Sequence, residues 1–523
     1  MKTIDFPPIL GCAAAGQWEK RQLENEKSEW AAMRMAGAEI ARGILDDFRE
    51  IGEFADSAKL LVLVGKGHNG GDALLAARWL LEKFPAAIAD IFLCFGESSF
   101  CPLARRALDE LMEAAGKRCR RMEFSRLKAE SVAYDLCLDG VFGFQFHPPL
   151  DKKTGQLIAW VNAHAGIRFR AAVDLPSGMS DEGAAKGFRA DFTYATGIVK
   201  SPVVAEPNGP LVGRLRYLDL GFFQGKNPKS DRRILTESLL DPIAMLRSSR
   251  SDKRTFGHLC VVGGSHNYPG AIMLAVRAAL RSGVGLVTAL VPEPLAAPYA
   301  AVHPEVMWVG CPPGSTGGLS VAALALLRER LQRANALLVG PGLGAAPESI
   351  ELVRRIAGEA ALPILLDADA LQPEVIEALG KKPFVCTPHA GEFKRIAPAL
   401  YAGQKFRCPR GVLVLKGPLT HITNGKNTYY SPFGGPVLAR GGSGDMLAGL
   451  IGGLLAQSPD DPLLAACRGV VWHGLAADLL ARAHGQVAVE NSQLLEQLGP
   501  ALTSTHARNI DGAAGVHGPE RPA

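Results

Sequence analysis

The sequence Gly441-Gly442-Ser443-Gly444-Asp445 is a glycine-rich turn that leads into an apolar stretch at residues 446–456. Glycines let backbone N–H groups approach an anion closely, and the positive end of a following helix favours negative charge at the turn. A carboxylate beside a bound phosphate would repel it, so Asp445 indicates a separate task, such as taking a proton from a substrate hydroxyl. The turn predicts a phosphoryl-transfer site; the alternative is an ordinary helix start capped by Ser443 and Asp445.

The composition of the chain narrows its class. With 523 residues, 47% of them hydrophobic, the chain can form two large α/β domains. Its 57 basic residues are spread out and the net charge is only +5, so we expect no nucleic-acid partner. Ten cysteines without a CxxC pair predict reduced core residues in a cytoplasmic protein. We expect no signal peptide. We also expect no membrane span, because the apolar stretch 446–456 is shorter than the roughly 20 residues needed. The protein is expected to form a homo-oligomer.

The chain divides into two α/β series. Buried runs alternate with helical patterns, which is typical of parallel sheets covered on both faces. In the first half these runs lie at 60–64, 91–95, 135–138, 170–173 and 192–196, and in the second half at 259–262, 286–291, 336–339, 364–366, 384–386 and 412–415. A hairpin is predicted around Asn424-Gly425.

These patterns set the predicted domain boundaries. We predict a first domain over residues 1–223, a polar linker over 224–236 and a second domain over 237–502. Residues 503–523, rich in Gly, Ala, Pro and His, predict a disordered tail. The predicted fold class is α/β, with two three-layer αβα domains.

The loop Gly65-Lys66-Gly67-His68-Asn69-Gly70-Gly71-Asp72 follows the first strand candidate. Its glycines satisfy the dinucleotide pattern G-x-G-x-x-G between a strand and a helix, so a nicotinamide-dependent dehydrogenase is one hypothesis. However, His68, Asn69 and Asp72 supply more side-chain chemistry than a backbone cradle for phosphate requires.

Further polar residues end other strand candidates. Asp139 and Asp174 each follow a buried run, and Ser177 and Lys200 come after Asp174. Ligands bind outside the carboxyl ends of parallel strands, so these side chains and Asn69 could converge there. Taken singly, each acid could equally be a turn former.

These segments resemble the NAD(P)H-hydrate epimerase family, over about residues 1–221. The resemblance rests on the segments 31–37, 65–72, 139–143 and 173–178, with Lys200 downstream. It implies a Rossmann-like domain that interconverts the R and S forms of hydrated NADH and NADPH, with Asp174 as the acid–base residue. It also implies K⁺ bound by Asn69, Asp139 and Ser177, and substrate contacts from His68, Asn69, Gly70, Gly71, Asp72, Gly143, Phe144, Gln145 and Asp174.

The chain departs from this family at two positions. Where the family usually shows Asn-Asn-Gly-Gly-Asp-Gly, this chain has His68-Asn69-Gly70-Gly71-Asp72-Ala73. A histidine can still donate a hydrogen bond, but Ala73 restricts the backbone where glycine is usual. Epimerase activity therefore depends on whether the fold accepts these two residues.

The second half resembles the ADP-dependent NAD(P)H-hydrate dehydratase family, which has a ribokinase-like fold. The resemblance spans about residues 253–478 and rests on many segments in the same order: 257–265, 270–271, 281–286, 304–307, 340–344, 367–371, 387–392, 416–420 and the turn at 441–445. It implies hydrated nicotinamide near Ala271, Gly342, His389 and Asp445. It places the nucleotide against Lys416, Gly417, Pro418, Leu419, Thr420, Gly441, Gly442, Ser443 and Gly444.

The resemblance implies a mechanism in which hydroxide leaves as phosphate. The β-phosphate of ADP is transferred to the ring hydroxyl with Asp445 as base, phosphate departs, and NAD(P)H and AMP remain. Backbone N–H groups of the turn stabilise the transferred group, and Mg²⁺ is expected on the phosphates. Arg440, where the family commonly has a small residue, either reaches a phosphate or faces solvent.

Three functions remain open on sequence grounds. The favoured one is a bifunctional repair enzyme, in which the epimerase supplies the isomer that the dehydratase consumes. The second is an ATP-dependent small-molecule kinase, because the ribokinase-like turn serves kinases too. In the third, the first domain is a non-catalytic nucleotide-binding module.

Overall fold

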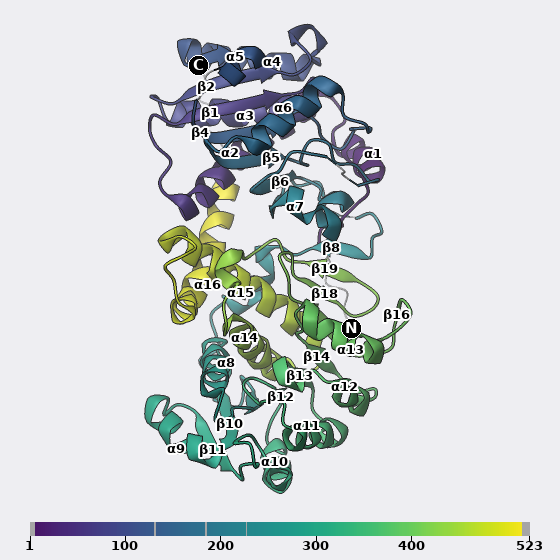
Figure 1. Ribbon diagram of the computed structural model, residues 1–523, viewed down its shortest axis with the longest axis vertical. Helices are drawn as coiled ribbons and strands as arrows, with labels where there is room; N and C mark the ends of the chain where they lie inside the picture. The colour runs from purple at the N-terminus through teal and green to yellow at the C-terminus, as the bar shows by residue number, and fades with distance from the viewer. Residues whose placement is uncertain (1–5, 130–131, 184–185, 226, 515–523) are drawn as a thin grey trace. The chain divides into compact units, whose positions relative to one another are not determined.

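The computed structural model describes residues 6–129, 132–183, 186–225 and 227–514 (Figure 1). These residues form two compact units. The N-terminal unit comprises Pro7–Ile234 together with Ala481–Gln486, and the C-terminal unit comprises chiefly Leu235–Leu480 and the residues from Val487 onward. Each unit has a mainly parallel sheet with helices on both faces, which confirms the predicted fold class.

The sheet of the N-terminal unit is entirely parallel, in the order β3-β2-β1-β4-β5-β6-β7. Its strands are β1 (Lys59–Val64), β2 (Ile88–Leu93), β3 (Cys119–Arg121), β4 (Tyr134–Gly140), β5 (Ile167–Val173), β6 (Phe192–Thr196) and β7 (Arg214–Leu218). The order reverses between β1 and β4, and ligands bind at such a point in open α/β sheets. The run predicted at 91–95 belongs to β2, which starts three residues earlier, at Ile88. Strands β3 and β7 were not among the predicted strands.

The alternation of side chains along β1 explains why this strand reads as a continuous apolar run. Leu60, Val62 and Val64 pack against α2 (Glu26–Phe48), α3 (His68–Lys83) and α4 (Pro102–Ala115). Leu61 and Leu63 pack on the other face, with α6 (Lys152–Ala163). Successive side chains of a strand point to opposite faces, so a strand covered on both sides is apolar at every position.

The sheet of the C-terminal unit contains strands in the order β11-β10-β9-β12-β13-β14-β17-β18-β19. They are β9 (His258–Val262), β10 (Leu286–Pro292), β11 (Met307–Cys311), β12 (Ala336–Val339), β13 (Ile364–Leu366), β14 (Phe384–Cys386), β17 (Gly411–Leu415), β18 (His421–Thr423) and β19 (Thr428–Tyr430). The predicted hairpin is confirmed, because β18 and β19 pair antiparallel across Asn424-Gly425. Strand β11 was not predicted, because this partly exposed strand is not a buried run.

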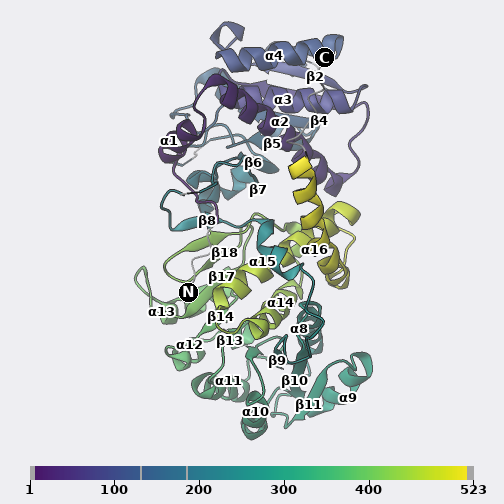
Figure 2. The same cartoon turned by 180° about the vertical axis from the view of Figure 1, so that it is seen from behind.

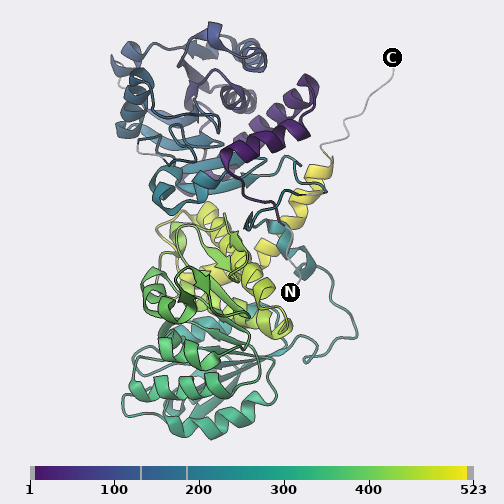
Figure 3. The ribbon, with the colours of Figure 1, turned by 90° about the vertical axis from the view of Figure 1, so that its right-hand side faces the viewer.

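Helices cover both faces of this second sheet as well. One face carries α10 (Leu324–Leu331), α11 (Pro347–Glu359), α12 (Pro373–Leu379) and α13 (Ala390–Leu400), the green helices of Figure 3. The helices α8 (Pro269–Arg281) and α14 (Ser443–Gln457) pack against each other and against the sheet (Figure 2). A Cβ on Gly449 would lie 1.9 Å from the carbonyl oxygen of Ala275, so glycine in α14 permits this close approach.

Two sequence expectations about the C-terminal region need correction. The expectation of no membrane span rested on the apolar stretch at 446–456, but helix α15 (Pro462–His484) is a longer apolar helix. It is long and apolar enough to cross a membrane, but 83% of its apolar window is buried in the protein, as in a core helix. Helix α16 (Asn491–Ala514) continues past residue 503, where we predicted a disordered tail, because neither Gly499 nor Pro500 ends it. Residues 515–523 lie outside the described residues, and the predicted linker contains the short strand β8 (Arg232–Ile234).

A buried charge cluster stabilises the N-terminal unit. Asp47, 1% exposed, accepts hydrogen bonds from Arg216 Nη2 and Arg482 Nη2, each at 2.8 Å, and from Tyr194 Oη at 3.1 Å. Burial alone would raise the pKa of Asp47, but the two guanidinium groups lower it well below its usual range. The carboxylate is therefore charged at neutral pH, and its contribution to stability is lost progressively as the pH falls below about 4.

Replacing Asp47 with alanine should lower the free energy of unfolding of the N-terminal unit by about 3–5 kcal/mol, because the buried guanidinium groups lose their counter-charge. Urea denaturation followed by circular dichroism measures this loss. The matched control is Asp46→Ala, since the neighbouring Asp46 lies at the surface and forms an ion pair with Arg49 at 3.7 Å. Asp46→Ala should cost less than about 0.5 kcal/mol, and equal losses in both variants would contradict the role of the cluster.

Candidate functional site

The segments predicted to form the phosphoryl-transfer site come together in the C-terminal unit. The loops at 263–271, 340–344, 367–371, 387–391 and 416–420 follow β9, β12, β13, β14 and β17. These strands are parallel, so all five loops lie at the carboxyl edge of the sheet. The strand order reverses between β9 and β12, as it does at ligand sites of open α/β sheets.

Lys416 lies at the centre of this group. Its Nζ atom is 2.9 Å from Asp367 Oδ1 and 4.0 Å from Glu392 Oε2. Asp367 is 1% exposed and also accepts a hydrogen bond from Thr387 Oγ1 at 2.7 Å. Burial alone would lower the pKa of Lys416, but the charges of Asp367 and Glu392 outweigh burial and raise it. Lys416 is therefore a fixed positive charge at neutral pH.

The glycine-rich turn packs directly against this charge. A Cβ on Gly444 would lie 3.2 Å from Lys416 Nζ, so a side chain at this position would crowd the ammonium group. Gly442 has φ +95°, a left-handed conformation that favours glycine, and it is the N-cap of α14. The N–H of Ser443 donates to Arg440 O at 3.3 Å, so this amide is already used within the turn. The amide of Gly444 has no acceptor within the helix, whereas the amide of Met446 donates to Gly442 O at 3.1 Å.

Asp445 lies in the first turn of α14 with an unusual protonation equilibrium. Burial and the negative charge of Asp367 raise the pKa of Asp445 to about 7, and Lys416 partly opposes this rise. A carboxyl group that titrates near neutral pH accepts a proton far more readily than an ordinary aspartate. The geometry thus places a strong carboxylate base beside a fixed cation and free backbone amides.

The residues just before α16 and at its first position hydrogen-bond to the glycine-rich turn. Arg440 Nη2 donates to Val487 O at 2.7 Å, and Asn491 Nδ2 donates to Gly441 O. A surface hollow of about 560 Å³ is lined there by Val487, Ala488, Val489, Glu490 and Gln493. Arg440 thus has a hydrogen-bond partner in the protein itself.

The residues predicted to contact the nicotinamide lie at neighbouring loops. A Cβ on Gly342, which has φ +65°, would be 3.1 Å from Ala271 Cβ, so these two positions are adjacent. His389 pairs with Lys416 in a β-bridge and is the N-cap of α13. Its Nδ1 accepts hydrogen bonds from the amides of Gly391 at 3.0 Å and Glu392 at 3.3 Å, and its Nε2 lies 3.5 Å from Glu392 Oε1.

Three residues of this site were not among the predicted site residues. Asp367 and Glu392 flank Lys416, and His473 on α15 is 6% exposed and hydrogen-bonds to the backbone of Ser443. Burial, followed by the charge of Lys416, lowers the pKa of His473 to about 4, so it supports the turn as a neutral imidazole. Asp367 and Glu392 lie in the segments 367–371 and 387–392 that carry the family resemblance, whereas α15 carries no local signal of its contact with the turn.

The N-terminal unit brings together the three predicted ligands for a cation. Ser177 donates to Asp139 through Oγ at 2.6 Å and through its amide at 2.7 Å. The same Oγ accepts the amide of Phe142 at 2.9 Å, while Asn69 Nδ2 donates to Phe142 O at 2.9 Å. Asn69 therefore directs its amide nitrogen to the backbone and leaves its carbonyl oxygen for another partner.

This oxygen cluster is buried and closely packed. Asp139 is completely buried, and burial raises its pKa to about 6 although hydrogen bonds from Ser177 and Val141 oppose the rise. A Cβ on Gly65 would lie 1.9 Å from Val141 O, so the glycine loop can approach the end of β4 only without a side chain. Carboxylate, hydroxyl and amide oxygens suit a hard cation, and a positive charge would stabilise the ionised form of Asp139.

Asp174 lies at the end of β5 in a strained conformation. Its φ is +64°, which is uncommon for a residue other than glycine. Asp174 is 4% exposed and forms an ion pair with the buried Lys200, while Thr196 Oγ1 lies 3.4 Å from Oδ1. Lys200 Nζ also lies 5.2 Å from the ring centre of Phe144. Backbone strain beside a buried ion pair is typical of functional sites.

Further acids surround the loop of the N-terminal unit. Burial raises the pKa of Asp72 well above its usual value, and the charges of Glu19 and Asp174 add to this effect. Glu19, on α1 (Cys12–Gln22), also has a raised pKa, chiefly because of burial. The charge of Asp174 thus acts on Asp72, as expected of two residues in one site. The predicted contact residue Gln145, in contrast, is exposed.

The structure accepts both departures from the family pattern. Ala73 lies inside α3 without a positive φ, and its Cβ occupies space that Gly140 leaves open. His68 begins α3 and hydrogen-bonds to Cys101, which raises the pKa of His68. Neither residue blocks the loop.

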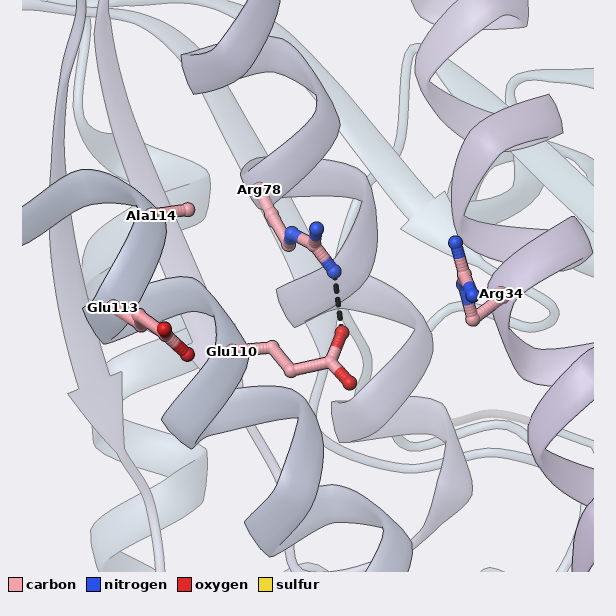
Figure 4. A pocket seen from close by; sticks show the side chains of 5 residues that line it. All are labelled: Arg34, Arg78, Glu110, Glu113 and Ala114. Carbon is pink, nitrogen blue, oxygen red and sulfur yellow. Dashed lines mark hydrogen bonds and ion pairs between the residues drawn. The ribbon is translucent and has the colours of Figure 1, made fainter. Parts of the chain in front are cut away.

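A second surface hollow lies away from these residues. It has a volume of about 470 Å³ and is lined by Arg34, Arg78, Glu110, Glu113 and Ala114 (Figure 4). Arg78 forms an ion pair with Glu110 across it. The hollow contains none of the predicted site residues, so we assign it no function.

Comparison with known families agrees with this division into two units. A family model described as NAD(P)H-hydrate dehydratase matches residues 259–500, and a model described as YjeF-related protein N-terminus matches residues 30–201. Among solved structures, an ADP/ATP-dependent NAD(P)H-hydrate dehydratase from Bacillus subtilis, co-crystallised with ATP and Mg²⁺, is 26% identical. The match covers 51% of this chain and 97% of that chain, with a TM-score of 0.42.

Curated relatives match nearly the whole chain. A bifunctional NAD(P)H-hydrate repair enzyme of Gloeobacter violaceus is 34% identical over 521 residues, which cover 95% of this chain and 98% of the relative. Another of the same name, from Escherichia coli, is 31% identical and covers 83% and 82%. The chain therefore belongs to the family of bifunctional NAD(P)H-hydrate repair enzymes.

Proposed function

We propose that this protein repairs hydrated NADH and NADPH, with an ADP-dependent dehydratase in the C-terminal unit and an epimerase in the N-terminal unit. The observation that carries the first activity is the Asp445 carboxylate, which has a pKa of about 7 and lies on a glycine turn packed against Lys416. The ten cysteines, all free thiols and nine of them buried, support a reducing cytoplasm as its location.

In the proposed dehydration, Asp445 takes the proton of the ring hydroxyl as the hydroxyl oxygen attacks the β-phosphorus of ADP. The bond to AMP breaks, and Lys416 with the free amides of the turn stabilises negative charge on the transferred group. The carbon–oxygen bond of the phosphate ester then breaks, the electron pair leaves with phosphate, and the neighbouring ring carbon loses a proton. NAD(P)H, AMP and phosphate result.

Magnesium fits the chemistry of this site. Glu392, which also accepts the amide of His389, would offer a hard carboxylate oxygen beside Lys416, whereas Asp367 is engaged by Lys416 and Thr387 and Asp445 acts as the base. When bound with the nucleotide, Mg²⁺ would neutralise phosphate oxygens. The residues of the chain supply the base, the fixed cation and the amides.

In the N-terminal unit, Asp174 would act as the acid–base residue. Lys200 keeps this carboxylate oriented, and the strained backbone fixes its position at the end of β5. Asn69, Asp139 and Ser177 would hold K⁺, whose charge would favour a negatively charged substrate group beside the loop. His68 can still donate a hydrogen bond in place of the usual asparagine.

Replacing Asp445 with asparagine should reduce ADP-dependent recovery of reduced-nicotinamide absorbance by at least about 100-fold, because no base remains to accept the hydroxyl proton. Purified protein is mixed with hydrated NADH, ADP and Mg²⁺. The control is Asp460→Asn, an exposed turn residue, which should retain full activity. ATP-dependent formation of a stable phosphorylated product, without NADH, would instead indicate a small-molecule kinase.

The pH dependence of the dehydratase should report on Asp445. The base acts when deprotonated, so kcat/KM should rise about tenfold per pH unit below pH 7 and level off above it. Lys416→Met removes a charge that lowers the pKa of Asp445, so the rise should move to higher pH. The control is Lys426→Met, at the exposed hairpin, which should leave the pH profile unchanged. If Lys416→Met also leaves the profile unchanged, the rise in kcat/KM belongs to a group other than Asp445.

Replacing Asp174 with asparagine should separate the two activities. With a mixture of R and S hydrates and excess ADP, the wild-type protein should consume both isomers in one phase. The variant should consume the S isomer at the normal rate and the remainder only at the spontaneous rate. Asp135→Asn, at the amino end of β4, is the matched control. Two phases in the wild-type protein would show that its epimerase is inactive.

A further inference from the structure

Two polar side chains of the C-terminal unit have no part in the proposed phosphoryl transfer. Ser265 follows β9, and Asp369 follows β13. Both flank Gly344: its amide donates to Asp369 Oδ2 at 2.9 Å, and a Cβ on Gly344 would lie 3.7 Å from Ser265 Oγ. The charge of Asp369 also contributes to the raised pKa of Asp445, so Asp369 belongs to the same site.

The hydroxyl of Ser265 is buried without a partner. Ser265 is 5% exposed, and its Oγ makes no hydrogen bond to any residue in the described part of the chain. Burial of a hydroxyl without a hydrogen bond is unfavourable, so such a group indicates a partner that comes from outside the chain. Ala271 and Gly342, which are predicted to contact the nicotinamide, lie nearby. The substrate is therefore the expected hydrogen-bond partner of Ser265.

The position of Asp369 is fixed by a strained turn. Ala368, between Asp367 and Asp369, has φ +50°, and a Cβ on Gly340 would lie 1.8 Å from Asp367 O. The turn directs Asp367 to Lys416 and Asp369 to Gly344. The amide of Gly344 donates to Oδ2 of Asp369, so Oδ1 of Asp369 can accept a hydrogen bond from a donor outside the described chain.

A hydroxyl donor beside a carboxylate acceptor matches a planar group with a carbonyl oxygen and an N–H. The hydrated nicotinamide ring carries such a group, its carboxamide. We propose that Ser265 donates to the carboxamide oxygen and that Asp369 accepts from the carboxamide nitrogen. This inference rests on the proposed dehydratase function and adds the residues that select the ring. A carboxylate in place of the carboxamide would be repelled by Asp369.

The test combines two variants with two substrates. The substrates are the hydrate of NADH and the hydrate of the reduced 3-acetylpyridine analogue, in which a methyl ketone keeps the carbonyl but lacks the N–H. Asp369→Ala should raise KM about tenfold for hydrated NADH and leave KM for the analogue unchanged, because the analogue never had this hydrogen bond. Ser265→Ala should raise KM for both substrates by similar factors. KM for ADP should stay within about twofold.

The matched control is Ser282→Ala, because Ser282 is equally buried but donates to Ala279 O at 2.6 Å. It should leave the preference for hydrated NADH over the analogue unchanged. If Asp369→Ala raises KM equally for both substrates, its role is structural and the assignment is overturned.

Direct binding separates this inference from the proposed reaction. Titration calorimetry without ADP compares the affinity of wild-type protein and Asp369→Ala for the two hydrates. Loss of the preference in the variant supports the carboxamide site even if wild-type protein shows no ADP-dependent recovery of NADH, which would refute only the reaction. Active wild-type protein that binds both hydrates equally would refute the carboxamide site and leave the reaction standing.

Discussion

The ion pair between Lys416 and Asp367 is the interaction on which the C-terminal site depends. It joins the ends of β13 and β17, and it sets a fixed positive charge against the glycine turn of α14. The same pair acts in two directions on Asp445, because Asp367 raises the pKa of that carboxyl group and Lys416 lowers it. Without Lys416, the pKa of Asp445 would rise further. The pair therefore controls both the charge that faces a phosphate and the protonation of the base.

The two units build their sites in a similar way although their strand orders differ. In each unit, a lysine pairs with an aspartate at the carboxyl end of a parallel strand, Lys200 with Asp174 and Lys416 with Asp367. Asp174 itself and Ala368, the neighbour of Asp367, are the non-glycine residues with positive φ in the described part of the chain. Backbone strain of this kind is retained where the surrounding structure fixes a side chain for a task.

The departures from the epimerase pattern illustrate how packing decides the effect of a substitution. The backbone at position 73 does not require glycine for a positive φ, because the start of α3 has helical geometry. The methyl group of Ala73 fits because Gly140 has no side chain. The proposed bifunctional repair is thus compatible with the residues present in this chain.

Much of the fold was determined by local sequence. Buried strands such as β6, β12, β13 and β14 coincide with apolar runs, because a strand covered on both faces must be apolar at every position. The loop motifs likewise located Asp174, Asp445 and the glycine turn. Edge strands such as β11 escaped prediction, because partial exposure removes the continuous apolar signal.

Only the tertiary structure showed the interactions between distant segments. The pKa of Asp445 depends on Asp367 and Lys416, which lie 78 and 29 positions earlier in the sequence. Likewise, the contact of His473 with the turn and the partnerless hydroxyl of Ser265 follow from helix and loop packing. Sequence periodicity determines which residues are buried, but electrostatic shifts and unmet hydrogen bonds depend on distances in space that no local pattern encodes.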